Sequence, residues 1–169
     1  RAAPDGYTML FGAIGRHAIN SVLPSKPKTY KFPDAFEGLS FGTAVPLVVA
    51  VSNGLGVNTL DELVNKIKHT PGKITYGSAG VGSSQHMAAE KFQLATGTKL
   101  LHVPYKGSGP AVTDLLGGQI DMVIDTLTTL YPQIKSGKIK FLAVTTADRV
   151  PTIPDVPTLN ELNVKDYVL

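Results

Sequence analysis

Residues 74–86 read Ile-Thr-Tyr-Gly-Ser-Ala-Gly-Val-Gly-Ser-Ser-Gln-His, and after a helix-like stretch residues 100–105 read Leu-Leu-His-Val-Pro-Tyr. This pattern predicts a strand, a glycine turn, a helix and a second strand. Ser83 or Ser84 falls at the position of a helix N-cap, and glycines allow positive φ and a close backbone approach. The turn glycines are Gly77, Gly80 and Gly82. Since such a turn aims unpaired N–H groups and a positive helix end at one point, it predicts a carboxylate or phosphate site.

The composition sets outer limits on the class of protein. With 169 residues, 43% hydrophobic and 17% charged, the chain can form one good core or two small ones. The net charge of +3 is small and Lys and Arg are scattered, so we expect no nucleic-acid partner. No apolar run approaches the roughly 20 residues of a spanning helix, so we expect no direct membrane insertion. The absence of cysteine excludes disulfides and thiolate catalysis, and fits an exported protein.

Both ends of the chain suggest that further sequence flanks it. The chain opens on Arg1 without an initiator Met or a signal peptide, and it soon enters the apolar run 9–11. Residues 167–169, Tyr-Val-Leu, resemble the start of a strand. We therefore expect missing sequence on both sides.

The first half of the chain contains three predicted elements. A short buried strand is expected over residues 7–11, followed by a loop over 12–17. An apolar strand is expected over 45–51, with Pro46 at its beginning. Thr59 and Glu62 form a capping box before a helical stripe of apolar residues, which Pro71-Gly72 ends.

From residue 74 onward, strands and helices alternate. Strands are expected over 74–76, 100–105, 120–125 and 139–145, and helices over 84–96, 110–116 and 130–135. Four strands separated by three helices predict a parallel, doubly wound α/β domain. Ligands of such sheets lie beyond the carboxyl ends of the strands. Three segments fall at that edge: 77–84, 104–109 and 125–128.

Seven sequence words occur in order and resemble one family. They are Pro-Asp-Gly-Tyr-Thr (4–8), His-Ala-Ile-Asn (17–20), Tyr-Gly-Ser-Ala-Gly-Val-Gly-Ser-Ser-Gln-His (76–86), His-Val-Pro-Tyr-Lys-Gly-Ser-Gly-Pro-Ala (102–111), Asp-Leu-Leu-Gly-Gly-Gln-Ile-Asp-Met (114–122), Leu-Ala-Val-Thr-Thr (142–146) and Pro-Asp-Val-Pro-Thr (154–158). Together they resemble the Bug (Bordetella uptake gene) family, the periplasmic solute receptors of tripartite tricarboxylate transporters. The resemblance spans nearly the whole chain and is weakest over residues 21–40.

The resemblance implies a periplasmic binding protein type II fold, in which two Rossmann-like α/β domains enclose a ligand cleft. Residues 1–50 would be the C-terminal part of domain 1 with the first hinge strand, residues 51–166 domain 2, and residues 167–169 the start of a return hinge strand. The chain would thus be a fragment, with a signal peptide upstream. It would bind a small carboxylate in the periplasm and deliver it to the membrane components of the transporter, without catalysis, metal or cofactor.

The resemblance also implies a set of ligand-binding residues. Backbone N–H groups of the glycine turn, with the serine hydroxyls, would hold the carboxylate, and a loop of the first domain would face them. Tyr105 and Lys106 would form one wall, and Asp125 with Thr126 the far end, where an acid suits a water or an ammonium group. The candidates are Ala13, Ile14, Gly15, Arg16, His17, Ser78, Ala79, Gly80, Gly82, Ser83, Ser84, His86, Tyr105, Lys106, Asp125 and Thr126.

Other interpretations of the same residues stay open. The turn glycines could be packing devices only, His86 a surface group, His102 a structural residue and Asp121 a solvent-facing acid. A nucleotide- or phosphate-binding α/β enzyme is the alternative function, although the turn reads Gly-x-x-Gly-x-Gly and no acid ends the next strand. No Gly-x-Ser-x-Gly elbow occurs, and the four histidines lack metal-ligand spacing. The effector domain of a transcription regulator is a third class, but no helix-turn-helix is visible.

Overall fold

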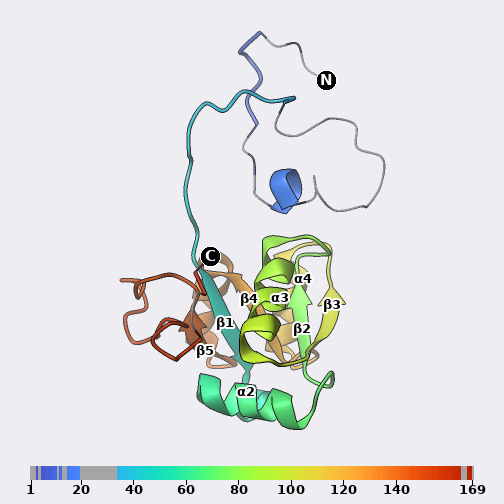
Figure 1. Cartoon of the computed structure of the whole chain (residues 1–169), viewed down its shortest axis with the longest axis vertical. Coiled ribbons are helices and arrows are strands. Elements are labelled where there is room, and N and C mark those ends of the chain that lie inside the picture. Colours follow the sequence, from blue (N-terminus) through green and yellow to red (C-terminus); the bar gives the residue numbers. More distant parts are fainter. Residues whose placement is uncertain are drawn as a thin grey trace. The chain divides into compact units, whose positions relative to one another are not determined.

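The computed structural model describes residues 3, 5–10, 12, 15–19, 34–164 and 167–168, with only the backbone of residues 15 and 16. By internal contacts the chain divides into two compact units, Arg1–Ala44 and Val45–Leu169 (Figure 1). In the first unit, one helical turn, η1, spans Gly15–Ile19. Its other described residues form no helix or strand.

The predicted buried strand over residues 7–11 is wrong for the part that the structure describes. Residues 7–10 form no strand, and Tyr7 and Met9 are 93% and 79% exposed. Phe11 lies outside the described residues. A strand needs a neighbour for its N–H and C=O groups, and none of the described strands pairs with this segment. The apolar side chains of this segment are therefore not enough by themselves to produce a strand.

The second unit contains a five-stranded sheet in the order β3-β2-β4-β1-β5. The strands are β1 (Leu47–Ser52), β2 (Thr75–Ser78), β3 (Leu101–Pro104), β4 (Met122–Thr126) and β5 (Ile139–Val144). Strand β2 is parallel to β3 and β4, whereas β1 is antiparallel to both β4 and β5. The sheet is therefore mixed, and the prediction of a purely parallel sheet is wrong. All six residues of β1 are buried, which is why this strand lies inside the sheet rather than at its edge.

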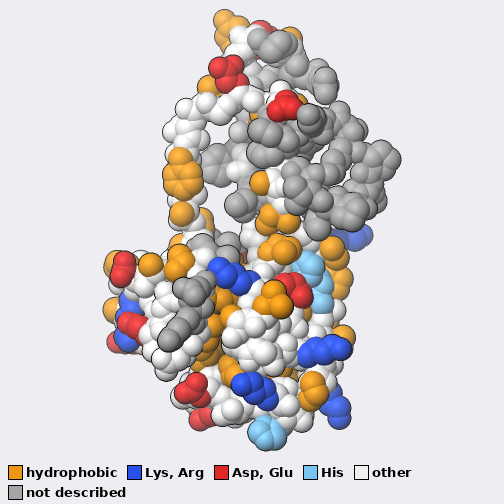
Figure 2. Space-filling view, in the orientation of Figure 1, with side chains coloured by type: hydrophobic (Ala, Val, Ile, Leu, Met, Phe, Trp, Pro, Cys, Tyr) orange, Lys and Arg blue, Asp and Glu red, His pale blue; other side chains and the backbone are white. Residues whose placement is uncertain are grey.

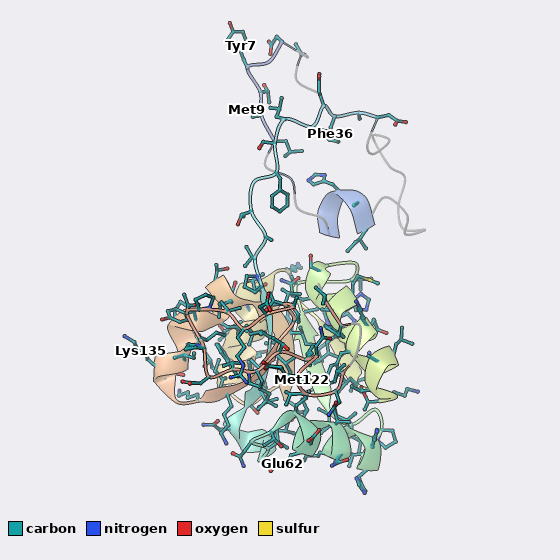
Figure 3. All side chains as sticks on the ribbon, turned by 60° about the vertical axis from the view of Figure 1, so that its left-hand side comes forward. Tyr7, Met9, Phe36, Glu62, Met122 and Lys135 are labelled. Atoms are coloured by element: carbon teal, nitrogen blue, oxygen red, sulfur yellow. The ribbon has the colours of Figure 1, made fainter. Side chains whose placement is uncertain are left out.

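The helices cover both faces of this sheet. Helices α2 (Leu60–His69) and α3 (Ser84–Thr96) share one hydrophobic cluster with Val49 and Val51 of β1. Helices α4 (Ser108–Leu116) and α5 (Leu127–Leu130) share the other with Val48 and Ala50. The alternation of β1 side chains between two clusters defines a three-layer α/β unit. In Figure 3, Met122 lies among the packed side chains of this unit, whereas Glu62 and Lys135 lie at its surface.

Local signals fix the helix ends. Ser83 caps α3 by accepting the N–H of His86 (3.2 Å), and Gly97 ends the helix at φ 61°, which confirms the predicted bounds. Thr59 accepts the N–H of Glu62 (3.2 Å) at the start of α2. The predicted helix over 130–135 is wrong in its bounds, because α5 ends at Leu130 and a 3-10 helix, η3, spans Tyr131–Ser136. Pro132 at the start of η3 donates no N–H and so favours the break.

The end of the described chain packs onto α3. Tyr167 is fully buried, and its hydroxyl donates to the carbonyl of Ala88. The ammonium of Lys91 lies 5.2 Å from the centre of the Tyr167 ring and also donates to the carbonyl of Val168 (3.1 Å). Tyr167 and Val168 themselves have no strand conformation. These contacts hold the C-terminal segment against the helix that follows the glycine turn.

Candidate functional site

The turn between β2 and α3 lies at the end of the second unit opposite α2 (Figure 1). We call residues 79–84 the β2–α3 turn. Because β2, β3 and β4 are parallel, the segments that follow them reach the same edge of the sheet. The N–H of Tyr105, just after β3, donates to the carbonyl of Ser78 (3.0 Å) and joins two of these segments directly. The predicted gathering at the carboxyl edge is confirmed.

The three turn glycines have different roles. Gly80 and Gly82 have φ of 119° and 77°, values that favour glycine. A Cβ at Gly80 would lie 3.1 Å from the carbonyl oxygen of Tyr105. Gly77 has no positive φ, but a Cβ there would lie 2.6 Å from Cδ1 of Ile120. The packing interpretation therefore holds for Gly77, whereas Gly80 and Gly82 shape the backbone of the turn.

Backbone N–H groups in the β2–α3 turn divide into two sets. Gly80 donates to Oγ of Ser78 (3.1 Å), Gly82 to Nδ1 of His86 (3.2 Å) and Ser83 to the carbonyl of Gly80 (3.1 Å). The other three N–H groups have no partner within the described part of the protein. They belong to Ala79, Val81 and Ser84. The turn thus has three unpaired donors beside the positive end of the 13-residue helix α3.

The serine hydroxyls also differ. Ser78 is fully buried, and its Oγ lies 2.7 Å from Nε2 of His102 and 3.3 Å from the carbonyl of Gly80, so it holds the turn from within. Ser83 is the helix cap. Ser84 is half-buried, and its hydroxyl has no hydrogen-bond partner among the described residues. Ser84 therefore adds a fourth available donor to the three N–H groups.

Three aromatic rings, of Tyr76, His102 and His86, form a stack, and His86 and His102 each contact a residue of β2 or of the turn. The ring centres of Tyr76 and His102 are 4.7 Å apart, and those of His102 and His86 are 4.3 Å apart, with interplanar angles of 13° and 8°. The Tyr76 hydroxyl donates to Oε1 of Glu90 (2.7 Å). Burial is the larger cause of a raised pKa of Tyr76, and this hydrogen bond is the next. Burial, and then the neighbouring His86, lower the pKa of His102 below its usual 6.5. His102 is therefore neutral at pH 7.

Asp125 connects the starts of α3 and α4. It is 1% exposed, and its Oδ1 accepts from Nε2 of Gln85 (2.9 Å), Oγ of Ser108 (3.0 Å) and the N–H of Thr126 (2.6 Å). Gln85 also donates to Oγ of Ser108 (3.0 Å), which closes a triangle of side chains. Oδ2 of Asp125 is buried and has no partner among the described residues. Sequence reasoning missed Gln85 and Ser108, although Gln85 shares its helix face with the buried Ala88 and Ala89.

Tyr105 and Lys106 follow β3 at the same edge. The Tyr105 hydroxyl donates to Oδ2 of Asp114 (2.7 Å), and burial followed by this bond raises the pKa of Tyr105 to about 12. The ring is therefore tied to α4. Lys106 is exposed, and its ammonium has no hydrogen bond or ion pair within the described residues. Thr126 is half-buried, and its hydroxyl lies 2.8 Å from that of Thr129.

The remaining candidates belong to the first unit. Gly15, Arg16 and His17 lie in η1, and the ring of His17 meets that of Phe36 edge-on at 5.9 Å. Ala13 and Ile14 lie outside the described residues. That these residues face the β2–α3 turn stays a prediction.

Asp121 corrects an expectation. It is half-buried rather than solvent-facing, and its Oδ2 accepts from the N–H (2.7 Å) and hydroxyl (2.8 Å) of Thr75, which joins β4 to β2.

A hollow of about 320 Å³ lies near Ser52–Gly54 and Leu115–Gly118, at the opposite edge of the sheet from the β2–α3 turn. Within the described ranges, no group of three or more His, Cys, Asp or Glu residues could hold a metal ion.

The visible described surface carries charges of both signs. Figure 2 shows blue and red side chains interspersed over the visible described surface, without a stripe of one sign. None of the helices in the described ranges has the length and apolar character needed to cross a membrane.

Several solved structures are similar to this chain, and they include a periplasmic binding protein. A periplasmic transporter is 37% identical, with a TM-score of 0.90 over 97% of this chain and 55% of its own. The periplasmic binding protein BugD is 39% identical, with a TM-score of 0.71 over 74% of this chain and 42% of its own. A protein of R. palustris with adipate is 36% identical, with a TM-score of 0.72 over the same shares of the two chains. The α/β fold of this chain is thus that of a periplasmic binding protein.

Sequence comparison gives the family. The chain matches the tripartite tricarboxylate transporter family receptor, TctC, over residues 1–169, and it belongs to this family. An Agrobacterium vitis UPF0065 protein is 38% identical over 169 residues, which cover 100% of this chain and 48% of that protein. BugT of Bordetella pertussis is 37% identical over 174 residues, which cover 99% of this chain and 52% of BugT. The chain spans about half the length of these curated relatives, and the resemblance to the Bug family is confirmed.

Proposed function

We propose that the β2–α3 turn is one side of a binding site for a small carboxylate, in a periplasmic receptor that delivers it to the membrane components of a tripartite tricarboxylate transporter. The observation that carries this proposal is the set of three unpaired N–H groups, of Ala79, Val81 and Ser84, at the start of α3. The similar protein of R. palustris with adipate and the family of the chain support a carboxylate over other anions.

The chemistry of the turn suits a carboxylate. Two carboxylate oxygens offer about four acceptor positions, which match three N–H groups and the hydroxyl of Ser84. Each hydrogen bond to a charged group contributes roughly 1.5–3 kcal/mol, and the positive end of α3 adds to the attraction. The exposed ammonium of Lys106 would raise the rate of capture through its field rather than through a contact.

The far end of the proposed site has the opposite preference. Oδ1 of Asp125 already accepts three hydrogen bonds, and the buried Oδ2 accepts none within the described residues. A buried carboxylate oxygen without a donor is costly, so this end favours a water, a hydroxyl or an ammonium group over a second carboxylate. Thr126 would line the same end, and Tyr105 with Lys106 would form one wall of the site. Ligand contacts from residues 13–17 remain part of the proposal, as the family resemblance implies.

Capture without chemistry fits these contacts better than catalysis. Ser83 caps α3, and Nδ1 of His86 accepts the N–H of Gly82, so this nitrogen is not available to activate a serine. No described histidine or carboxylate has a hydrogen bond to the hydroxyl of Ser84. The similar solved proteins are likewise binding proteins.

Calorimetry on the full-length protein tests the proposal. Adipate, shorter dicarboxylates and amino acids would be titrated, and the recovered acid examined by NMR. We expect at least one acid to bind and to be returned unchanged. Ser84→Ala should weaken binding about ten- to a hundredfold, because one hydrogen bond to the anion is lost. Thr152→Ala, at an exposed position without side-chain hydrogen bonds in the described structure, should have no effect.

Three results would contradict the proposal. They are the absence of binding by every acid to a folded protein, conversion of a bound acid, and wild-type affinity in Ser84→Ala. Binding of a nucleotide in place of an acid would favour the alternative of a nucleotide-binding enzyme.

A further inference from the structure

His86 holds part of the β2–α3 turn in place. Its Nδ1 accepts the N–H of Gly82 (3.2 Å), and an accepting nitrogen cannot carry a proton. The ring in this geometry is therefore neutral, with its proton on Nε2, which lies 3.8 Å from Oε1 of Glu90. A protonated ring would turn an N–H donor toward another N–H donor. The contact between Gly82 and His86 therefore exists only for the neutral ring.

His102 supports the same turn by a second route. Its ring stacks on His86 with 4.3 Å between the ring centres, and its Nε2 lies 2.7 Å from Oγ of Ser78. That hydroxyl oxygen in turn accepts the N–H of Gly80 (3.1 Å). Two stacked imidazoles thus hold alternate amides of the turn, one directly and one through a serine. The amides that alternate with them along the turn, of Ala79 and Val81, are unpaired within the described residues.

We propose that His86 is a positioning residue of the carboxylate site, whose neutral ring withholds the N–H of Gly82 from the ligand and whose protonation releases it. This inference rests on the function proposed above. Protonation would add a fourth N–H donor and a positive charge beside the turn. A carboxylate should therefore bind more tightly as the pH falls from about 8 to about 6, while the acid itself stays ionised.

The groups that face His86 act in both directions. Glu90, on its own helix, attracts a proton to the ring, and the tyrosine hydroxyl of Tyr76 donates to the same carboxylate. Two groups oppose a positive charge on His86. They are the ring of His102, from β3, whenever that ring is itself protonated, and the positive start of α3. The β2–α3 turn contributes no charged side chain.

The first experiment needs no ligand. In full-length protein, the ¹⁵N–¹H signal of Gly82 would be followed by NMR from about pH 8 to about pH 6 together with the imidazole signals of His86. We expect the two to move together. In His86→Gln the side-chain oxygen can still accept the N–H but does not titrate, so the Gly82 signal should stay constant. His69→Gln, on the exposed end of α2, is the matched control and should behave like wild type.

The second experiment measures affinity for adipate over the same pH range. Wild type and His69→Gln should bind adipate several-fold more tightly at the lower pH, about three- to tenfold for one added charge-assisted donor in a solvated site. His86→Gln should lose this dependence, with the same affinity for adipate at both ends of the pH range, because its side-chain amide does not titrate, whereas the loss of a merely structural residue would leave the pH dependence in place. A Gly82 amide that ignores the titration of His86, or an undiminished pH dependence in His86→Gln, would overturn the inference. If adipate does not bind, the acid that binds in the calorimetry described above takes its place. If no acid binds, the proposed function fails, and the Gly82 signal alone decides the role of His86.

Discussion

Gly80→Ala is the sharpest single test of the β2–α3 turn. Gly80 has a φ of 119°, a conformation that L residues rarely adopt, and an added Cβ would lie 3.1 Å from the backbone oxygen of Tyr105. The substitution therefore meets both a backbone and a steric restriction. Because the neighbouring oxygen belongs to the main chain of the β3–α4 segment, it cannot move aside as a flexible side chain would.

The size of the effect follows from these two restrictions. A non-glycine residue in a rare backbone conformation costs of order 1–3 kcal/mol, and the close oxygen puts Gly80→Ala at the upper end, about 3 kcal/mol. Gly97, at the other end of α3, has a φ of 61° and no atom within 4 Å of an added Cβ. Gly97→Ala should therefore cost only about 1 kcal/mol, the usual penalty for the left-handed region.

Two measurements separate stability from binding. Urea unfolding of both variants gives the loss of folding free energy, and calorimetry with adipate gives the affinity. Gly80 lies between Ala79 and Val81, whose N–H groups are unpaired, so a shift of this residue misdirects both donors. We expect Gly80→Ala to bind more than about tenfold more weakly, a loss of about 1.4 kcal/mol or more, and Gly97→Ala to bind like wild type.

The outcome that refutes this reasoning is a folded Gly80→Ala protein with wild-type affinity. The ligand would then not contact the β2–α3 turn, and its glycines would serve packing alone. Equal weakening in both variants would also contradict it, because the effect would then come from general destabilisation.

The other predictions concern the surroundings of the site. Asp125→Ala should destabilise the fold by about 3 kcal/mol in urea unfolding, because Gln85, Ser108 and Thr126 lose an acceptor, whereas exposed Asp148→Ala should change it by less than about 0.5 kcal/mol. The pKa of Tyr105 is raised from 10.0 to about 12. The neutral Tyr105 side chain therefore stabilises the fold fully below pH 10, and this stabilisation is lost as the pH rises to about 12. Asp114→Asn should lower the pKa of Tyr105 in an NMR titration. The pKa of Glu161 is lowered, chiefly by the hydrogen bond from the N–H of Thr158 and then by Arg149, so Glu161→Gln should destabilise the protein at neutral pH but not in acid, where the wild-type carboxyl is protonated as well. Burial is the larger cause of the lowered pKa of His102, and the neighbouring His86 is the next, so His86→Gln should raise this pKa toward 6.5. An unchanged NMR titration of His102 would contradict the stacked geometry.

Predictions from sequence succeeded where the signals are local. Both ends of α3 are set by residues within one turn of them, Ser83 as the N-cap and Gly97 in the left-handed region, and these ends were predicted correctly. The place of β1 in the sheet was not predicted, because its pairing with β4 and β5 joins residues far apart in the sequence. The strand prediction for residues 7–10 was wrong for the same reason, since an apolar run forms a strand only beside a partner strand.

The same distinction applies to the candidate site. Glycine spacing predicted a turn with backbone donors, and the positive φ of Gly80 and Gly82 agrees with it. Sequence alone did not reveal which amides would be occupied, because the acceptors depend on the fold. The triangle of Gln85, Ser108 and Asp125 was missed for a similar reason, since its members come from three separate segments that meet only at the carboxyl edge of the sheet.

The pairing of alternate amides explains why the turn is more than a glycine loop. Along residues 79–82, the first and third N–H groups are unpaired, and the second and fourth are held by Ser78 and His86. The held pair costs the site two donors, but it fixes the direction of the other two before any ligand arrives. A preorganised donor loses less conformational entropy on binding than one on a mobile loop. Ser78→Ala should therefore weaken carboxylate binding although Ser78 is fully buried, and calorimetry that found no loss would show that the turn keeps its shape without this support.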